Sequence, residues 1–175
     1  SVADFTTFSF HAVKNFTTAE GGALAWRDAG FDNDGFYHQI MLQSLHGQSK
    51  DALAKTKVGA WEYDVVFPGY KCNMTDMQAA VGLVQLQRYP GMLERRKQMV
   101  ARYRNNLEFA PCGIEMMPHI IGDSVSSHHL MLTRIEGADG DMRNRVIERM
   151  GEMGVACNVH YKPLPLLTAY KNLGF

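Results

Sequence analysis

The sequence predicts an α/β fold, in which helices pack against short β-strands. Residues 5–10 are rich in aromatic and β-branched types, which favour a strand. Residues 75–78 read Thr-x-x-Gln, the pattern of a capping box at the start of a helix. In the last third of the chain, segments 129–135 and 155–161 have strand-like composition and flank a helical pattern. Strand, helix and strand in this order indicate a small α/β layer.

The composition is that of an ordinary globular protein. The chain has 175 residues, of which 46% are hydrophobic and 21% are charged, enough for one domain or parts of two. The formal net charge is zero and no apolar stretch reaches about 20 residues, so neither nucleic acid nor a membrane is an expected partner. Three widely spaced cysteines fit neither a disulfide framework nor a zinc site. They favour a reducing compartment, so we expect a cytoplasmic protein.

The first half of the chain alternates strands, turns and one helix. Residues 11–18 are expected to form a loop, followed by a turn at 20–22 and a second strand at 23–26. Asn33 and Asp34 are candidate caps for a helix that reaches about His46, with Gly47 as its stop. Residues 48–71 lack a clean period, which predicts a long functional loop.

One long helix is expected to follow the capping box. Apolar residues recur at helical spacing at Met77, Ala80, Val81 and Val84, and the stripe continues beyond Pro90. Proline favours a helix start or a bend, so we predict a long helix bent near residues 89–90. We place the domain boundary there, with one domain part at 1–89 and another at 90–175.

A second capped helix is expected in the last third. Asp141 is the candidate N-cap and Gly154 the candidate stop, because apolar residues at Val146, Ile147, Met150 and Met153 share one helical face. His128 and His129 are adjacent on the predicted strand, so their side chains would point to opposite faces and could not share a metal ion. We expect no metal site.

The chemistry of the sequence is concentrated around Lys14. An apolar strand delivers this lysine into a loop, where partial loss of hydration would make its amine a nucleophile. The hydroxyls of Ser9 and Thr17, together with exposed backbone N–H groups, suit a phosphate. An amine beside a phosphate-binding loop is what pyridoxal 5'-phosphate (PLP) requires. From these residues alone, a solvated lysine without a chemical role remains the alternative.

A family resemblance favours the first of these two interpretations. Ser-Phe-His-Ala-Val-Lys-Asn at 9–15, followed by Thr-Ala-Glu-Gly-Gly at 18–22, resembles the lysine motif of the DegT/DnrJ/EryC1/StrS family. These are fold-type I PLP enzymes that mostly aminate nucleotide-linked keto-sugars. The resemblance implies that Lys14 forms a Schiff base with PLP and moves protons between cofactor and substrate, and that Ser9 binds the phosphate. Dehydratases of the family have histidine at this position, so the lysine favours transamination.

Residues 68–80 resemble a second family motif, Gly-Tyr-Asn-x-Arg-Met-Thr-Asp-x-Gln-Ala-Ala. In the family this loop reaches across a dimer to the partner's cofactor phosphate. Here Lys71 stands where asparagine is usual, and Asn73 stands where arginine is usual. A lysine can still bind a phosphate, so we expect Lys71 and Asn73 to be cofactor-binding residues. For Asn73 and Thr75 the alternative role is helix capping.

A looser match lies at residues 159–164, Val-His-Tyr-Lys-Pro-Leu, near the substrate entrance of the family. Pro165 replaces a common second histidine. The resemblance implies sugar contacts by His160 or Tyr161. The alternative is a strand end packed by Tyr161, with His160 half exposed.

The resemblance therefore implies the end of a fold-type I large PLP domain and part of the small α/β C-terminal domain, without the family's N-terminal half and extreme C-terminus. It implies glutamate or glutamine as the amino donor, a nucleotide-linked keto-sugar as the acceptor, and a homodimer. Alone, the chain is expected to be inactive. Three alternatives stay open: a non-catalytic assembly or regulatory module, a dehydratase relative, and a hydrolase. The hydrolase ranks last because the sequence has no Gly-x-Ser-x-Gly elbow.

Overall fold

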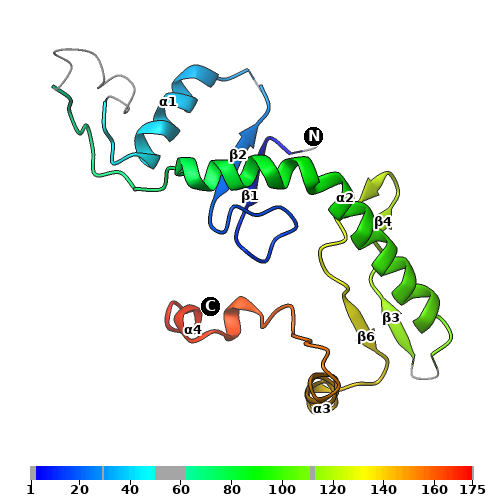
Figure 1. Cartoon of the computed structure of the whole chain (residues 1–175). Helices are drawn as coiled ribbons and strands as arrows, with labels where there is room; N and C mark the ends of the chain where they lie inside the picture. Colours follow the sequence, from blue (N-terminus) through cyan, green and yellow to red (C-terminus); the bar gives the residue numbers. More distant parts are fainter. Residues whose placement is uncertain (1–2, 29, 50–61, 111–112, 175) are drawn as a thin grey trace. The chain divides into compact units, whose positions relative to one another are not determined.

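The computed structural model describes residues 3–28, 30–49, 62–110 and 113–174 (Figure 1). The chain divides into two compact units, residues 1–92 and 93–175.

The first unit opens with an antiparallel hairpin. Strand β1 (Phe5–Ser9) pairs with strand β2 (Gly22–Trp26), in a register that runs from Phe5↔Trp26 to Ser9↔Gly22. Both predicted strands are confirmed, and the predicted loop lies between them. The hairpin carries the loop that contains Lys14.

Helix α1 (Asn33–Ser44) follows the hairpin, and its cap differs from the prediction. Asp32 is the N-cap, because its backbone is extended and its side chain accepts a hydrogen bond from the N–H of Gly35. Asn33, a predicted cap, is the first helical residue, and its Oδ1 instead accepts a hydrogen bond from Trp26 Nε1 at 3.0 Å. The other predicted cap, Asp34, lies in the first turn.

Tyr70, a residue far along the chain, fixes the end of α1 through backbone hydrogen bonds. The helix ends before His46 and not at it, because His46 and Gly47 both have positive φ, 60° and 70°. The N–H of His46 donates to the Tyr70 carbonyl at 2.7 Å, and the N–H of Tyr70 donates to the Gln43 carbonyl at 2.7 Å. The described ends of the predicted 48–71 loop thus lie against α1, while residues 50–61 are outside the described ranges.

Helix α2 (Asp76–Leu107) confirms the prediction of one long helix, and Pro90 lies inside it. The predicted capping box is also confirmed. The N–H of Gln78 donates to Thr75 Oγ1 at 3.3 Å, and the N–H of Thr75 donates to Gln78 Oε1 at 2.9 Å.

Aromatic rings join the hairpin of the first unit to α1. The ring of Phe36 lies 5.0 Å from that of Trp26, 5.6 Å from that of Phe5 and 5.6 Å from that of Phe31. The pairs with Trp26 and Phe31 are edge-to-face and the pair with Phe5 is tilted, and aromatic pairs at these separations are favourable. This cluster holds the base of the hairpin against the helix.

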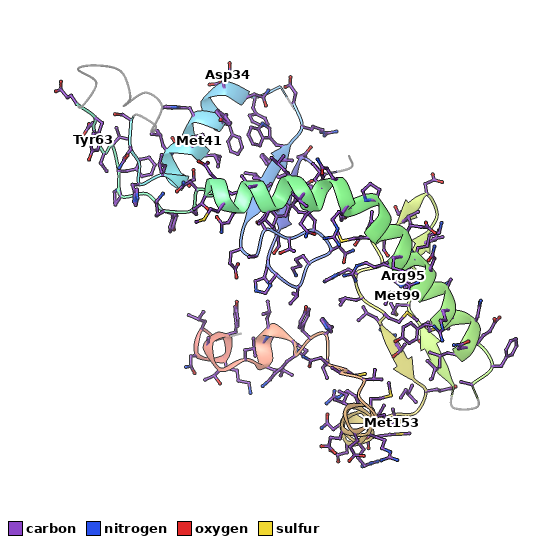
Figure 2. The ribbon with its side chains drawn as sticks, in the orientation of Figure 1. Asp34, Met41, Tyr63, Arg95, Met99 and Met153 are labelled. Atoms are coloured by element: carbon purple, nitrogen blue, oxygen red, sulfur yellow. The ribbon has the colours of Figure 1, made fainter. Side chains whose placement is uncertain are left out.

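Few apolar side chains are buried in the described part of the chain. Among those residues, only Leu42 and Val100 are buried apolar side chains. On α2, Met77 is 80% exposed and Leu83 is 67% exposed, and the exposed Met41 and Met99 are labelled in Figure 2. An apolar surface of this kind is available for contact with further protein.

The second unit contains two short antiparallel pairs. Strand β3 (Ile114–Met116) pairs with β6 (Thr133–Ile135), and β4 (Ile120–Ile121) pairs with β5 (Ser124–Val125). The predicted strand 129–135 is therefore wrong over 129–132, because its three-residue partner pairs only with 133–135. The prediction also missed β3, β4 and β5, which are too short to show a period.

Helix α3 (Gly140–Glu152) confirms the second predicted helix but not its cap. Asp139 is the N-cap, and its Oδ1 accepts a hydrogen bond from the N–H of Met142 at 2.8 Å. The predicted cap, Asp141, lies in the first turn, where its charge favours the helix N-terminus.

The predicted strand at 155–161 is wrong. Over residues 113–174 no strand pairs with this segment, and without such a partner its backbone cannot join a hydrogen-bond ladder. A 3-10 turn, η2 (Leu164–Leu166), and the short helix α4 (Thr168–Asn172) follow. No helix in the described ranges is both long and apolar enough to cross a membrane.

Two histidines of the second unit stack near the β4–β5 pair. The rings of His119 and His128 lie 4.7 Å apart at 14°, and His119 Nδ1 lies 2.6 Å from Ser126 Oγ. Burial lowers the pKa of His119 below its usual 6.5, and the positive charges of His128 and Arg104 lower it further.

The lowered pKa of His119 gives a pH dependence with a defined sign. The folded chain favours the neutral ring of His119. The contribution of this ring to the free energy of unfolding is therefore complete above pH 6.5 and is lost as the pH falls below that value. We expect the free energy of unfolding to fall more steeply from pH 7.5 to about pH 5 in the wild type than in His119→Gln. Urea unfolding at several pH values across this range measures the free energy of unfolding of each protein. The exposed His38→Gln serves as the control, and equal slopes for wild type and His119→Gln would contradict the assignment.

Two glycines on α2 allow a matched test of packing. A Cβ at Gly82 would lie 3.0 Å from the methyl carbon of Thr18, whereas a Cβ at Gly91 would meet nothing within 4 Å. We expect Gly82→Val to lower the free energy of unfolding by about 2 kcal/mol, because the valine overpacks the contact. Gly91→Val should cause no loss, since valine is a better helix former than glycine. Denaturant unfolding gives the free energy of unfolding of both variants. Similar losses in the two would contradict the contact between Thr18 and Gly82.

Candidate active site

The candidate site is built on residues 10–21, the connection between β1 and β2, which we call the lysine loop. Its ends are tied together, because the N–H of Phe10 donates to the Gly21 carbonyl at 2.8 Å and the N–H of Thr18 donates to the Phe10 carbonyl at 3.0 Å. Within the loop, the N–H of Lys14 donates to the His11 carbonyl at 2.9 Å. Lys14 therefore lies at the end of a closed turn, not on a free strand extension.

Two threonine hydroxyls stabilise the lysine loop from inside. Thr17 Oγ1 donates to the Phe10 carbonyl at 3.0 Å and accepts from the N–H of Ala19 at 3.0 Å. Thr18 Oγ1 donates to the Glu20 carbonyl at 2.8 Å, and Thr18 is only 2% exposed. The sequence suggested Thr17 as a phosphate ligand, but the structure uses its hydroxyl within the loop.

The lysine loop packs against α2. The methyl group of Thr18 faces Gly82, and the ring of Phe16 lies 6.1 Å from that of Tyr89 in an edge-to-face contact. Gln78 Nε2 donates to the Glu20 carbonyl at 3.0 Å. The helix thus provides a rigid support for the loop that carries the candidate nucleophile.

The chemical groups of the loop are an amine and a hydroxyl. The side chain of Lys14 is half-buried and Ser9 is exposed at the end of β1. The N–H of His11 is 3.5 Å from Ser9 Oγ, and His11 Nε2 lies 3.5 Å from Glu20 Oε1. An amine suits an aldehyde and a hydroxyl suits a phosphate, so this donor set fits PLP.

Residues 71–75 form a second candidate segment of the first unit. Lys71 Nζ donates to Asn73 Oδ1, and Asn73 Nδ2 donates to the Met74 carbonyl at 3.5 Å. Capping of α2 is performed by Thr75, so the capping role is confirmed for Thr75. The Met74 side chain packs on the lysine loop, since its terminal carbon lies 3.1 Å from the position of a Cβ at Gly21.

The candidate sugar-binding residues lie in the second unit. The rings of His160 and Tyr161 are 4.3 Å apart, and Tyr161 is 72% exposed. The alternative of a strand end packed by Tyr161 is wrong, because no strand forms there and the side chain is exposed. Both side chains are accessible to a ligand.

Sequence reasoning missed the residues that support the loop. Gln78 was found as part of the capping box, but its contact with Glu20 spans 58 positions of the chain. The packing of Thr18 on Gly82 has no local signal. Within the described ranges, no group of three or more metal-binding side chains lies together.

Comparison with known proteins defines the class. The model of the DegT/DnrJ/EryC1/StrS aminotransferase family matches residues 1–174. The chain belongs to this family, which confirms the resemblance seen in the lysine motif. It is an enzyme family, and PLP is its cofactor.

Individual relatives agree with the family match. The spore coat polysaccharide biosynthesis protein SpsC of Bacillus subtilis is 36% identical over 179 residues, which cover 100% of this chain and 44% of SpsC. Spr1654 of Streptococcus pneumoniae, assigned as a sugar aminotransferase and solved in its PMP form, is 56% identical with a TM-score of 0.91, over 100% of this chain and 44% of Spr1654. DesI, solved with its TDP-sugar product, is 25% identical with a TM-score of 0.76, over 98% of this chain and 40% of DesI.

These matches confirm the expected fold-type I class. The chain spans less than half the length of these relatives.

The buried hydroxyl of Thr18 gives a test of the loop structure. Thr18→Val keeps the shape but removes the donor to the Glu20 carbonyl, so we expect a loss of about 1 kcal/mol in the free energy of unfolding. Thr7→Val, the same change at an exposed position of β1, should cause no loss, because valine also favours strands. Urea unfolding of both variants measures the difference, and an unchanged Thr18→Val variant would exclude this role for the hydroxyl.

Proposed function

We propose that the protein at its full length is a PLP-dependent sugar aminotransferase in which Lys14 is the catalytic residue. The observation that carries the proposal is the placement of Lys14 on a closed loop, braced by α2, in a chain that matches the aminotransferase family throughout residues 1–174.

Four residues of the first unit are proposed to hold the cofactor. Lys14 binds it through the amine, and Ser9 donates a hydrogen bond to its phosphate. Lys71 supplies a positive charge for a phosphate, and Asn73 orients that amine through the hydrogen bond it accepts. When bound, PLP supplies an electron sink for the substrate carbon. The amine of Lys14 then carries protons to and from that carbon as a general acid and base.

The proposed amino donor is glutamate or glutamine, and the proposed acceptor is a nucleotide-linked keto-sugar. The bound TDP-sugar of DesI and the polysaccharide role of SpsC support a sugar of this kind. We assign sugar contacts to His160 and Tyr161, whose side chains are exposed. An exposed ring pair can stack on a sugar and donate hydrogen bonds to its hydroxyls.

The proposed organisation follows that of the family. Residues 1–89 end the large PLP-binding domain, and residues 90–175 form part of the small domain. Residues 68–76 complete the site of a second copy in a cytoplasmic homodimer. The exposed apolar side chains of α2 support a need for further protein contacts.

Replacement of Lys14 tests the proposed function. The full-length wild type with added PLP should show a visible absorbance band that survives dialysis, and Lys14→Ala should lack the band. Amino transfer from glutamate to a keto-sugar nucleotide should fall by about a hundredfold or more in Lys14→Ala.

The matched control is Lys97→Ala on α2, because Lys97 is exposed and its nearest carboxylate, Glu94, is 3.9 Å away. This variant should keep both the band and the activity. Absence of the band from the wild type would favour a non-catalytic module, and a band that persists in Lys14→Ala would remove this lysine from the mechanism.

A further inference from the structure

The side-chain amide of Gln78 contacts two segments that are distant in the sequence. Its Oε1 accepts from the N–H of Thr75 at 2.9 Å and from Thr75 Oγ1 at 3.0 Å. Its Nε2 donates to the Glu20 carbonyl at 3.0 Å. One amide group therefore joins the end of the 71–75 segment to the lysine loop.

The orientation of this amide is determined by its partners. A backbone N–H can only donate, and a backbone carbonyl can only accept. The oxygen of Gln78 must therefore face Thr75, and its nitrogen must face Glu20. A glutamate at this position could keep the capping box but could not donate to the Glu20 carbonyl when ionised.

The segments on both sides of Gln78 carry the candidate cofactor groups. The lysine loop carries Lys14, and the 71–75 segment carries the hydrogen-bonded pair of Lys71 and Asn73. Glu20, the acceptor, also receives Thr18 Oγ1 on the same carbonyl, and its carboxylate faces His11. A shift of Glu20 would therefore move the end of the loop that holds Lys14.

We propose that Gln78 is a positioning residue, whose amide fixes the lysine loop relative to the 71–75 segment through the Glu20 carbonyl. The structural part depends only on these contacts, and its consequence for PLP rests on the proposed function. Gln78 touches neither Lys14 nor Lys71 in this role, since it acts through Glu20 and Thr75. The helix cap and the loop position thus share one side chain.

The test uses Gln78→Glu in the full-length protein, with Gln87→Glu as the matched control on an exposed position of the same helix. Hydrogen exchange follows the backbone N–H groups of Phe10 and Thr18, whose hydrogen bonds close the lysine loop. Loss of one hydrogen bond should speed their exchange by about tenfold in Gln78→Glu. The N–H of Ala79, which donates to the Thr75 carbonyl in the first turn of α2, should exchange at the wild-type rate.

A second measurement follows the cofactor in the same proteins. The dissociation constant for PLP, from titration of the visible band, should rise by about fivefold to tenfold in Gln78→Glu and stay unchanged in Gln87→Glu. The melting temperature should stay within a few degrees of the wild type, because the capping box is kept. If Gln78 served only the overall stability of the protein, Gln78→Glu would lower the melting temperature. The exchange rates of the Phe10 and Thr18 N–H groups, relative to that of Ala79, would then stay unchanged.

The outcomes separate this proposal from the proposed function. Unchanged exchange at Phe10 and Thr18 in Gln78→Glu overturns the positioning role, even if the wild type binds PLP through Lys14. Faster loop exchange with an unchanged dissociation constant supports the structural link but overturns its consequence for PLP binding. If the wild type gives no visible band, the proposed function fails, and faster exchange at the two loop positions then still supports the structural link.

Discussion

The contact between the lysine loop and α2 is the constraint on which the candidate site depends. The hairpin alone would leave a twelve-residue connection held by its own hydrogen bonds. Thr18, with 2% of its surface exposed, packs against the glycine at position 82, where an added Cβ would lie only 3.0 Å from the threonine methyl carbon. A helix is stiff compared with a loop, so this contact transfers the rigidity of α2 to the segment that carries Lys14.

The same helix organises the rest of the first unit. Its capping box ends the segment that holds Lys71 and Asn73, and the residue that completes the box reaches the lysine loop. The N-terminus of α2 therefore holds both candidate cofactor segments, although Lys14 and Lys71 are more than fifty positions apart in the chain. Catalytic groups need to be held within a fraction of an ångström, and shared support by one rigid element provides such precision.

The described residues bury few apolar side chains, which limits the stability that they gain from their own packing. Leu42 and Val100 are the buried apolar side chains of the described residues, while apolar side chains of α2 remain exposed. Burial of apolar surface is the main favourable term in folding, so the contacts among these elements supply little of that term.

The sequence by itself determined the two strands β1 and β2, the helices α2 and α3, the capping box at Thr75 and the family, because each depends on local propensity or on a contiguous motif. It placed the caps of α1 and α3 one or two residues too late, at Asn33 and Asp141, since several neighbouring acidic or amide side chains can cap equally well. Only the tertiary structure decided that residues 155–161 form no strand, that Thr17 serves the loop itself, and that Gln78 joins the loop to the helix. These features depend on partners far along the chain, and no local pattern of residue types specifies which partner a backbone or side-chain group will meet.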